Sequence, residues 1–365
     1  MHKQDVETPA PIVDRGRMER NLRRMVEVAR KGGARLRPHT KTHKSPAIAN
    51  RSVELGAEGI TVAKLGEAEV MAAAGLDDIL VAYPIVGEKK ITRFLDLNER
   101  VRMACTTDSY EVAKCLSVAA DAQGQMVRLL VELDCGLNRM GLPPGEPVLE
   151  LVRMMGDLPG IHFAGLLTHG ARVRHMKELN ELPVIARQES DSCLETAELL
   201  RKNGFEVEEN SIGSTPLARH EAVPGITELR PGTFIFYDVN TVSMGAATFD
   251  DCAYTILTTV VSCHSDRLVV DAGSKALSND RPEAQFLPPG FGTVVDHPHL
   301  RVDRLSEEHG VLVPQGEGLI PKIGEKIEII PNHVCQSVNL HDALHIVEEG
   351  QVVDRLPIEG RGKVV

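Results

Sequence analysis

Short apolar runs alternate with longer amphipathic stretches through the first two thirds of the chain. Apolar positions three and four residues apart predict helices, as at 17–29 and 65–74. The short apolar runs between such stretches predict strands. The predicted strands are 34–37, 59–62, 79–82, 101–105, 127–133, 162–168, 211–213 and 228–234. Strands that alternate with helices form a parallel sheet, and this number of them closes economically into a (β/α)8 TIM-like barrel.

The last third of the chain has a different pattern, in which β-branched runs follow one another closely without a long helical period. These runs are 255–262, 267–271, 326–330 and 345–347. The sequence therefore predicts an α/β protein with a barrel at 15–245, followed by a mostly β domain at 246–365. A short apolar run at 10–13 can belong to either domain, so residues 1–14 can pair with the β domain.

Composition limits the classes of partner and compartment. The chain has 365 residues, a net charge of -11 and only 3% aromatic residues, which argues against nucleic acid or an anionic membrane as a partner. The cysteine count of seven is odd and there is no CxxC pair, which fits a reducing compartment. We find no apolar signal core at the N-terminus and no run of membrane-spanning length, so we expect a cytoplasmic enzyme.

The densest cluster of reactive side chains is Arg-Pro-His-Thr-Lys-Thr-His-Lys at 37–44, directly after the first predicted barrel strand. Active sites of such barrels lie at the carboxyl ends of the strands. Crowded basic groups disfavour the ammonium form of Lys41, and a neutral amine is what an imine-forming lysine needs. A basic surface turn is the alternative explanation of the same residues.

A second candidate site is Asn-His-Val-Cys at 332–335, in the β domain after a predicted strand. Alternate residues of a strand point to the same side, so His333 and Cys335 can both reach one cation. A His nitrogen and a Cys thiolate suit Zn²⁺ or a similar transition metal. A buried cysteine beside a hydrogen-bonded histidine is the alternative reading of this pair.

Two small-residue loops follow the last predicted barrel strands. They contain Gly213, Ser214 and Thr215 in the first, and Gly232 and Thr233 in the second. Backbone N–H groups and hydroxyls in such turns can hold a phosphate, and barrel phosphate sites favour the last loops. Either loop can also be an ordinary connection.

With these segments in place, the chain resembles the D-threonine aldolase and D-serine dehydratase family over nearly its whole length. The motifs that carry the resemblance are 37–44 and 331–335, supported by 8–10, 133–136 with Arg139, 167–169, 213–216, 228–232, 271–275, 307–310 and 338–340. Members of this family share the alanine racemase-like fold, in which a barrel that binds pyridoxal 5′-phosphate (PLP) precedes a β domain. The resemblance therefore implies a PLP enzyme.

The resemblance also implies roles for individual residues. Lys41 resembles the Schiff-base lysine, with Lys44 as the nearby alternative. His169 resembles the histidine that packs against the pyridine ring, and Arg230 the residue that faces the pyridine nitrogen. His333 and Cys335 resemble a metal pair. The phosphate cup that the family implies consists of Ser214, Thr215, Gly232 and Thr233, with Tyr237 close by in the sequence.

The implied reaction is a lyase reaction on a β-hydroxy-D-amino acid, with Lys41, His39 and His43 as candidate bases. Our first choice is D-threonine aldolase-like cleavage to glycine and an aldehyde, because 338–342 resembles the aldolases. The near-equal alternative is D-serine dehydratase-like or 3-hydroxy-D-aspartate dehydration to a 2-oxo acid and ammonia, because the family's D-serine dehydratases resemble this chain in pairing histidine with cysteine. A thiolate ligand favours Zn²⁺ over Mn²⁺.

Two further expectations concern other classes and partners. An amino-acid racemase on this fold needs a tyrosine from the β domain, where Tyr254 lies in an apolar run typical of a core residue. By analogy with the family we expect a homodimer. Arg172, Arg174 and His175 can bind an acidic substrate tail or form a solvated turn.

Overall fold

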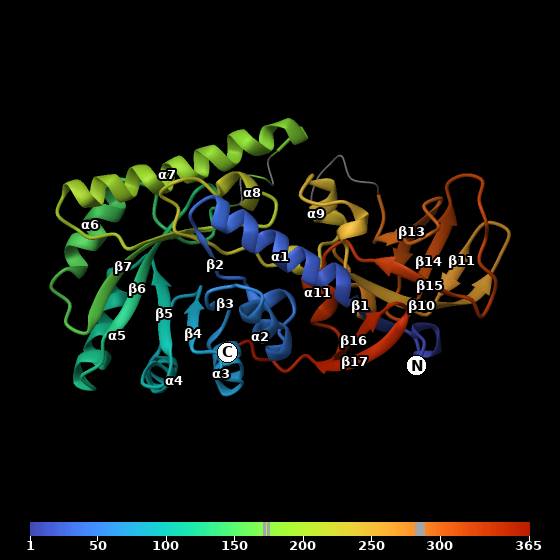
Figure 1. Cartoon of the computed structure of the whole chain (residues 1–365), viewed down its shortest axis with the longest axis horizontal. Helices are drawn as coiled ribbons and strands as arrows, with labels where there is room; N and C mark the ends of the chain where they lie inside the picture. Colours follow the sequence, from blue (N-terminus) through green and yellow to red (C-terminus); the bar gives the residue numbers. More distant parts are fainter. Residues whose placement is uncertain (171–172, 174–175, 282–288) are drawn as a thin grey trace. The chain divides into compact units, whose positions relative to one another are not determined.

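The structure, a computed structural model, describes residues 1–170, 173, 176–281 and 289–365 (Figure 1). The predicted residues Arg172, Arg174 and His175 lie outside this part of the chain. Contacts divide the described residues into two compact units. The barrel unit contains Arg23–Lys41, Pro46–Gly232 and Gly362–Val365, and the β unit contains Met1–Leu22, Thr42–Ser45 and Thr233–Arg361.

Eight parallel strands form the barrel unit, in the order β2-β9-β8-β7-β6-β5-β4-β3. Their bounds are β2 (Arg35–Leu36), β3 (Ile60–Val62), β4 (Asp78–Val81), β5 (Arg102–Thr107), β6 (Val127–Leu133), β7 (Ile161–Thr168), β8 (Glu209–Ile212) and β9 (Glu228–Leu229). A parallel bridge between His39 and Thr61 joins the two ends of this sheet. The predicted TIM-like barrel is confirmed, and each run that we assigned to a barrel strand overlaps one.

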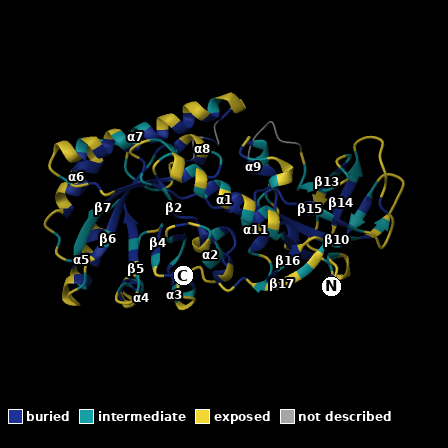
Figure 2. Cartoon of the chain, in the orientation of Figure 1, coloured by how far each residue is buried: buried dark blue, intermediate teal, exposed yellow. Residues whose placement is uncertain are grey.

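Helices connect these strands and cover the outer side of the sheet (Figure 1). They are α2 (Pro46–Glu54), α3 (Leu65–Ala73), α4 (Glu88–Asn98), α5 (Tyr110–Ala122), α6 (Glu146–Met155), η4 (Leu179–Glu181), α7 (Leu182–Lys202) and α8 (Ala218–Glu221). Their amphipathic pattern produces buried and exposed stripes, which Figure 2 shows as alternating colours along α7. On its exposed stripe, α7 carries the ion pairs Arg187–Asp191 and Glu198–Lys202 at i,i+4 spacing.

One glycine is required where two barrel strands approach closely. Gly165 of β7 has a φ of +144°, and a Cβ at this position would lie 2.0 Å from the carbonyl oxygen of Glu209 in β8. The pairing of β6 with β7 also shifts register between Leu129 and Leu130. Only a residue without a side chain fits this irregular crossing.

A nine-stranded sheet forms the core of the β unit, in the order β11-β14-β13-β12-β15-β10-β1-β16-β17. Its strands are β1 (Ala10–Asp14), β10 (Tyr254–Cys263), β11 (Leu268–Val270), β12 (Thr293–Val294), β13 (Leu300–Leu305), β14 (Gly310–Pro314), β15 (Lys326–Ile330), β16 (Ala343–Glu348) and β17 (Gln351–Pro357). β1 lies antiparallel to β10 and parallel to β16. A mostly β domain after the barrel is therefore confirmed, and the first strand of the chain pairs with it.

Helix α1 (Arg15–Lys31) contains the first boundary between the units, and short helices complete the β unit. These are η1 (Lys3–Asp5), η5 (Thr233–Ile235), α9 (Val239–Ser243), η6 (Phe249–Asp251), α10 (Ser274–Leu277) and α11 (Val334–Val338). The chain enters the β unit at Thr233, earlier than the sequence boundary at 245, because η5 and α9 bond to its strands and loops. For example, the Val239 N–H donates to the Pro331 carbonyl. No described helix is long and apolar enough to cross a membrane.

Candidate active site

Lys41 lies on a turn at the carboxyl end of the first barrel strand. β2 ends at Leu36, and the chain continues into the 3-10 helix η2 (Thr40–Thr42). His39 bridges to Thr61, and its Nδ1 accepts the backbone N–H of Lys41 at 3.4 Å. The bridge that closes the barrel therefore also fixes the backbone of Lys41.

His169 follows β7 and lies near Lys41 in the barrel unit. Its Nδ1 lies 3.1 Å from the carbonyl oxygen of Gly213, so Nδ1 carries the proton and donates it. Burial and then the positive charge of Lys41 lower the pKa of His169 to about 3, with smaller effects from Arg230 and Arg139. The ring is neutral at physiological pH and close enough to Lys41 to sense its charge.

A chain of buried hydrogen bonds fixes Arg230. Its Nε donates to Ser211 Oγ at 2.7 Å, and its Nη2 donates to the carbonyl oxygen of Thr168. Ser211 Oγ in turn donates to Glu228 Oε1 at 2.6 Å. Glu228 and Arg230 alternate along one strand direction, so both point to the same side. The guanidinium is a permanent cation with a single defined orientation.

Glu228 is the anion that balances this basic cluster. Its Oε2 accepts Arg37 Nε at 2.6 Å and Arg35 Nε at 2.9 Å. Burial alone would raise the pKa of Glu228, but the charges of Arg37 and Arg35 outweigh it and hold the pKa at about 2. Glu228 is therefore ionised throughout the physiological pH range.

The loop after β8 has the features of a phosphate-binding turn. Gly213 has a φ of +148°, and a Cβ there would lie 2.7 Å from the backbone nitrogen of Arg230. Ser214 and Thr215 are buried, and Ser214 Oγ has no hydrogen-bond partner among the described residues. A buried hydroxyl without a protein partner fits a phosphate oxygen. Gly232, in the second predicted loop, is the last residue of the long barrel-unit segment Pro46–Gly232.

Thr233 and Tyr237, the other residues predicted near the phosphate, belong to the β unit. The Tyr237 N–H donates to the Thr233 carbonyl at 2.7 Å, and the Tyr237 side chain is buried. Its φ of +50° is a left-handed conformation that a bulky residue rarely adopts. Such backbone strain concentrates at functional sites, which is consistent with the predicted place of Tyr237 beside the phosphate.

His333 and Cys335 do not lie on a strand, so our strand-alternation argument was wrong. β15 ends at Ile330, and His333 is the N-cap of α11, whose first turn contains Cys335. The extended Asn-His segment followed by a helical turn brings the two side chains to within hydrogen-bonding reach of each other. The two side chains are therefore neighbours as predicted, but the start of helix α11 brings them together rather than a strand.

Charge around His333 favours its protonated form when no cation is bound. Burial lowers the pKa of His333. Hydrogen bonds and negative charge from Cys335, Asp238 and Asp280 outweigh burial and raise this pKa to about 10. A bound metal ion displaces such a proton. No group of three or more His, Cys, Asp or Glu side chains in the described residues is arranged to hold a metal. The pair fits an open site completed by water or substrate.

Two hydroxyls surround the Cys335 sulfur within the β unit. Thr42 Oγ1 lies 3.2 Å from Cys335 Sγ, and Thr233 Oγ1 lies 3.7 Å from it. Thr42 is fully buried and is the next residue after Lys41 in the chain. Hydroxyl donors stabilise a thiolate, which is the form of cysteine that binds a metal.

His43, a candidate base, is buried in the β unit. Its Nδ1 accepts the Ser45 N–H at 3.1 Å. Burial lowers the pKa of His43 to about 3, so the ring is neutral, and its proton resides on Nε2 because Nδ1 is an acceptor. The Nε2 edge of His43 is therefore a hydrogen-bond donor.

Tyr254 is a core residue. It is fully buried in β10, its hydroxyl lies 2.9 Å from Ser337 Oγ, and its ring packs against Phe236 with centroids 5.7 Å apart. Burial raises the pKa of Tyr254 above its ordinary value of 10. A tyrosine held in this way is not available as a surface-facing base.

Three acidic residues that hydrogen-bond to these site residues or to their neighbours were not predicted from the sequence: Glu228, Asp238 and Asp280. The alternation of Glu228 with Arg230 on one strand was a usable signal. Asp238 begins a capping box with Thr241, which is a helix-start signal. Asp280 Oδ2 lies 2.8 Å from His333 Nδ1, across a long separation in sequence that no local pattern reveals.

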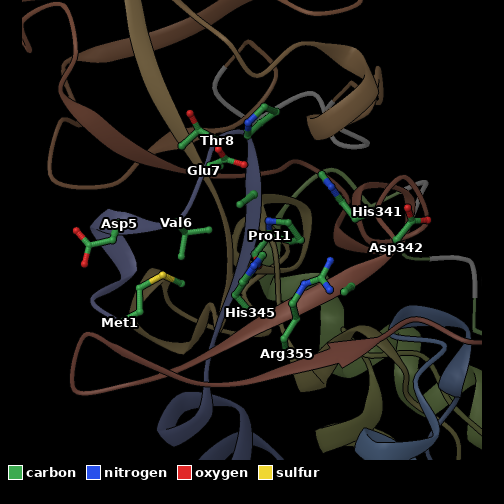
Figure 3. A pocket seen from close by; sticks show the side chains of 13 residues that line it. Met1, Asp5, Val6, Glu7, Thr8, Pro11, His341, Asp342, His345 and Arg355 are labelled. Carbon is green, nitrogen blue, oxygen red and sulfur yellow. The ribbon is translucent and has the colours of Figure 1, made fainter.

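A separate pocket of about 600 Å³ lies within the β unit (Figure 3). The N-terminal segment lines it together with His341, His345 and Arg355. None of the predicted cofactor or metal residues lines this pocket. The reactive groups described above are therefore distinct from it.

Two family models match the chain. The alanine racemase N-terminal domain matches residues 13–239, and the putative serine dehydratase domain matches residues 253–347. The two matches correspond in order to the barrel and to the β-rich part of the chain.

Known relatives and solved structures match over almost the full length. The D-threonine aldolase of Arthrobacter sp. is 32% identical over 98% of this chain and 93% of its own length. The D-threo-3-hydroxyaspartate dehydratase of Delftia sp. (strain HT23) is 33% identical over 90% of this chain and 91% of its own length. Its structure covers 98% of both chains with a TM-score of 0.92 and 30% identity, and a cysteine-to-alanine variant has been solved in the metal-free form. The D-threonine aldolase structure from Filomicrobium marinum covers 100% of this chain and 98% of its own, with a TM-score of 0.91 and 34% identity.

Proposed function

The chain belongs to the alanine racemase-like family of D-threonine aldolases and D-serine dehydratases, and we propose that it is a PLP- and divalent-metal-dependent lyase acting on β-hydroxy-D-amino acids. We propose aldol cleavage to glycine and an aldehyde as its main reaction. The observation that carries the proposal is that Lys41 lies close to His169 in the barrel unit, with Arg230 donating to the carbonyl oxygen of Thr168, the residue before that histidine.

The barrel residues fit PLP. When bound, PLP supplies an electron-accepting ring that stabilises negative charge at the substrate Cα. Lys41 Nζ is the proposed attachment point, and the orphan hydroxyl of Ser214 supports a phosphate at the Gly213 turn. The neutral ring of His169 can pack against the cofactor without adding charge. Arg230, held by Ser211, would face the pyridine nitrogen and keep it unprotonated.

We assign proton transfer to Lys41 rather than to the neighbouring histidines. With substrate bound, the Lys41 amine would receive the proton of the β-hydroxyl at Nζ. Nδ1 of His43 accepts a backbone N–H, so its Nε2 carries a proton and is not a base. Nδ1 of His39 accepts the Lys41 N–H, which supports a role for His39 in holding the turn.

His333 and Cys335 are the proposed ligands of a divalent metal, with Zn²⁺ preferred over Mn²⁺ because of the thiolate. When bound, the cation supplies a Lewis acid that polarises the β-hydroxyl of the substrate. The Delftia dehydratase has been solved as a cysteine-to-alanine variant in a metal-free form, which supports metal binding in this family. The hydroxyls of Thr42 and Thr233 beside Sγ support a thiolate at Cys335.

Dehydration to a 2-oxo acid and ammonia is the second candidate. A cysteine in the proposed metal pair is the observation that favours it, because the D-serine dehydratases that the chain resembles pair histidine with cysteine. Racemisation is less well supported, since the buried Tyr254 cannot serve as a second base.

The test is a product assay on purified protein with PLP and added Zn²⁺ or Mn²⁺. D-threonine, D-serine and 3-hydroxy-D-aspartate are supplied in parallel with the L-forms of threonine and serine. We expect an aldehyde and glycine from the D-substrates, and loss of activity after chelation. A 2-oxo acid plus ammonia without glycine would favour dehydration, and interconversion of enantiomers without metal would refute the lyase.

The cofactor lysine has an independent test. Borohydride reduction of the holoenzyme followed by peptide mass spectrometry identifies the lysine that carries the pyridoxyl group. We expect the label on Lys41, because its charge is close enough to His169 to lower the pKa of that histidine. A label on Lys44, the nearby lysine with a φ of +51°, would contradict the assignment.

A further inference from the structure

One carboxylate contacts the proposed metal histidine directly. Asp280, which follows α10, places Oδ2 2.8 Å from His333 Nδ1. The two side chains are 39% and 29% exposed, and an ion pair of that exposure contributes little to stability. So small a contribution leaves orientation of the ring as the main physical consequence of the contact.

The backbone on both sides of His333 is independently anchored. The buried Asn332 side chain donates through Nδ2 to the carbonyl oxygens of Asp280, at 3.0 Å, and Gly290, at 2.9 Å. On the other side, Asp238 Oδ2 accepts the Val334 N–H at 3.0 Å. With its neighbours held, His333 retains mainly the freedom to rotate its ring.

Asp238 also lies near His333, but both of its carboxylate oxygens accept hydrogen bonds from other groups. Its Oδ1 accepts the Thr241 N–H at 2.9 Å and the Thr241 hydroxyl at 2.7 Å. Asp238 is therefore occupied with the backbone of α9 and α11. Among the described residues, Asp280 is the carboxylate whose hydrogen bond reaches the His333 ring.

We propose that Asp280 is a positioning residue that orients His333 so that Nε2, and not Nδ1, binds the metal ion shared with Cys335. This inference rests on the proposed function, since it takes the pair as metal ligands. Hydrogen bonding of a ligand histidine to a carboxylate fixes its tautomer and increases its basicity as a ligand. The carboxylate of Asp280 and the thiolate of Cys335 together also neutralise a divalent cation.

The experiment measures metal affinity of the full-length chain, without reference to activity. Zn²⁺ is titrated against a chromophoric chelator for the wild type, Asp280→Asn and Asp280→Ala. We expect dissociation constants about 10- to 100-fold higher for the variants, which is the usual effect of removing such a partner. Asn keeps an acceptor oxygen, so we expect a smaller loss for Asp280→Asn than for Asp280→Ala. Asp266→Asn, which changes a 70% exposed aspartate of the same unit, is the matched control and should bind like the wild type.

Co²⁺ substitution separates a positioning residue from a ligand. We expect the variants, at saturating Co²⁺, to keep the wild-type visible spectrum and its thiolate charge-transfer band, because the ligand set is unchanged. A spectrum that shows a lost ligand would make Asp280 a ligand and overturn the proposal, as would unchanged Zn²⁺ affinity in Asp280→Ala.

Metal binding by the wild type and by Cys335→Ser separates the role of Asp280 from the existence of the metal site. A wild-type chain that binds neither Zn²⁺ nor Co²⁺ would refute both. Metal binding that is lost in Cys335→Ser but unchanged in Asp280→Ala would leave the metal site in place and refute the role of Asp280 alone.

Discussion

At the scale of single residues, burial and fixed hydrogen bonds decide which side chains can change charge. His43 and His169 are held neutral, whereas Glu228 is held ionised by two arginines. These states follow from the surroundings of each group rather than from the residue type. We draw two predictions about the free energy of unfolding from these charge states.

Acid should weaken the fold through His43. Its pKa is about 3 in the folded chain and 6.5 in its ordinary state, so below pH 6.5 the unfolded chain binds a proton that the folded chain does not. Stability is therefore lost as pH falls from about 6.5 toward 3, by about 1.4 kcal/mol per pH unit. Asparagine can accept the Ser45 N–H without titrating in this range, so in His43→Asn the loss between pH 7 and pH 5 should be about 2 kcal/mol smaller.

Urea unfolding at the two pH values measures this difference. His264→Asn, an exposed histidine of the same unit, is the control and should leave the pH dependence unchanged. Equal pH dependence in His43→Asn and the wild type would show that His43 is not held neutral.

Loss of the Glu228 charge should be strongly destabilising. In Glu228→Gln, Arg37 and Arg35 lose their buried partner, and breaking a buried pair costs about 3–5 kcal/mol. Glu54→Gln removes the 63% exposed partner of Arg51 and should cost less than about 1 kcal/mol. Denaturant unfolding of both variants checks the contrast, and a small effect at Glu228 would contradict the electrostatic account.

At the scale of elements, closely approaching strands require a glycine at positions that the hydrophobic pattern of the sequence does not identify. Gly165 allows β7 and β8 to cross where the carbonyl of Glu209 occupies the space of a side chain. This crossing lies within the strand that leads to His169. Packing of the barrel thereby constrains the position of the proposed cofactor residues.

Gly165→Ala should therefore cost more than an ordinary glycine substitution, about 3 kcal/mol or more, because it adds a backbone clash to the strain of positive φ. Gly75 has a φ of +90° but no atom within 4 Å of an added Cβ. Gly75→Ala should show only the conformational cost, about 1–2 kcal/mol. The difference between the two in thermal or denaturant unfolding isolates the clash, and equal effects would refute it.

At the scale of the whole molecule, the chain contributes proposed site residues from both of its units. Lys41, His169 and Arg230 belong to the barrel unit, whereas Thr233, His333 and Cys335 belong to the β unit. The chain changes unit directly after Lys41 and directly after Gly232, both within segments assigned to the site. On the proposed assignment, each unit thus contributes residues to the reaction.

We expect the full-length protein to be a homodimer, by analogy with its family. Size-exclusion chromatography with light scattering should give twice the mass of one chain. The mass should persist on dilution to the concentrations used for assay. A monomer that retains lyase activity would show that one chain is sufficient for the reaction.

Much of the fold could be predicted because its signals are local. The alternation of apolar runs with helical stretches identified every barrel strand, and the change of pattern near residue 245 identified the β domain. The motif at 37–44 drew attention to Lys41 for the same reason, since crowded basic groups are visible along the chain. Hydrophobic periodicity is a property of neighbouring residues, and so the sequence alone contains it.

Other features were decided only by tertiary structure. The pairing of β1 with β10 and β16, the approach of Asp280 to His333, and the contact of Thr42 with Cys335 each join residues far apart in the sequence. The helix start at His333 was misjudged as a strand, because Asn-His-Val-Cys has no strong local preference and the buried Asp238 caps the Val334 N–H. Burial and long-range hydrogen bonds set these positions, and they exist only once the chain has folded.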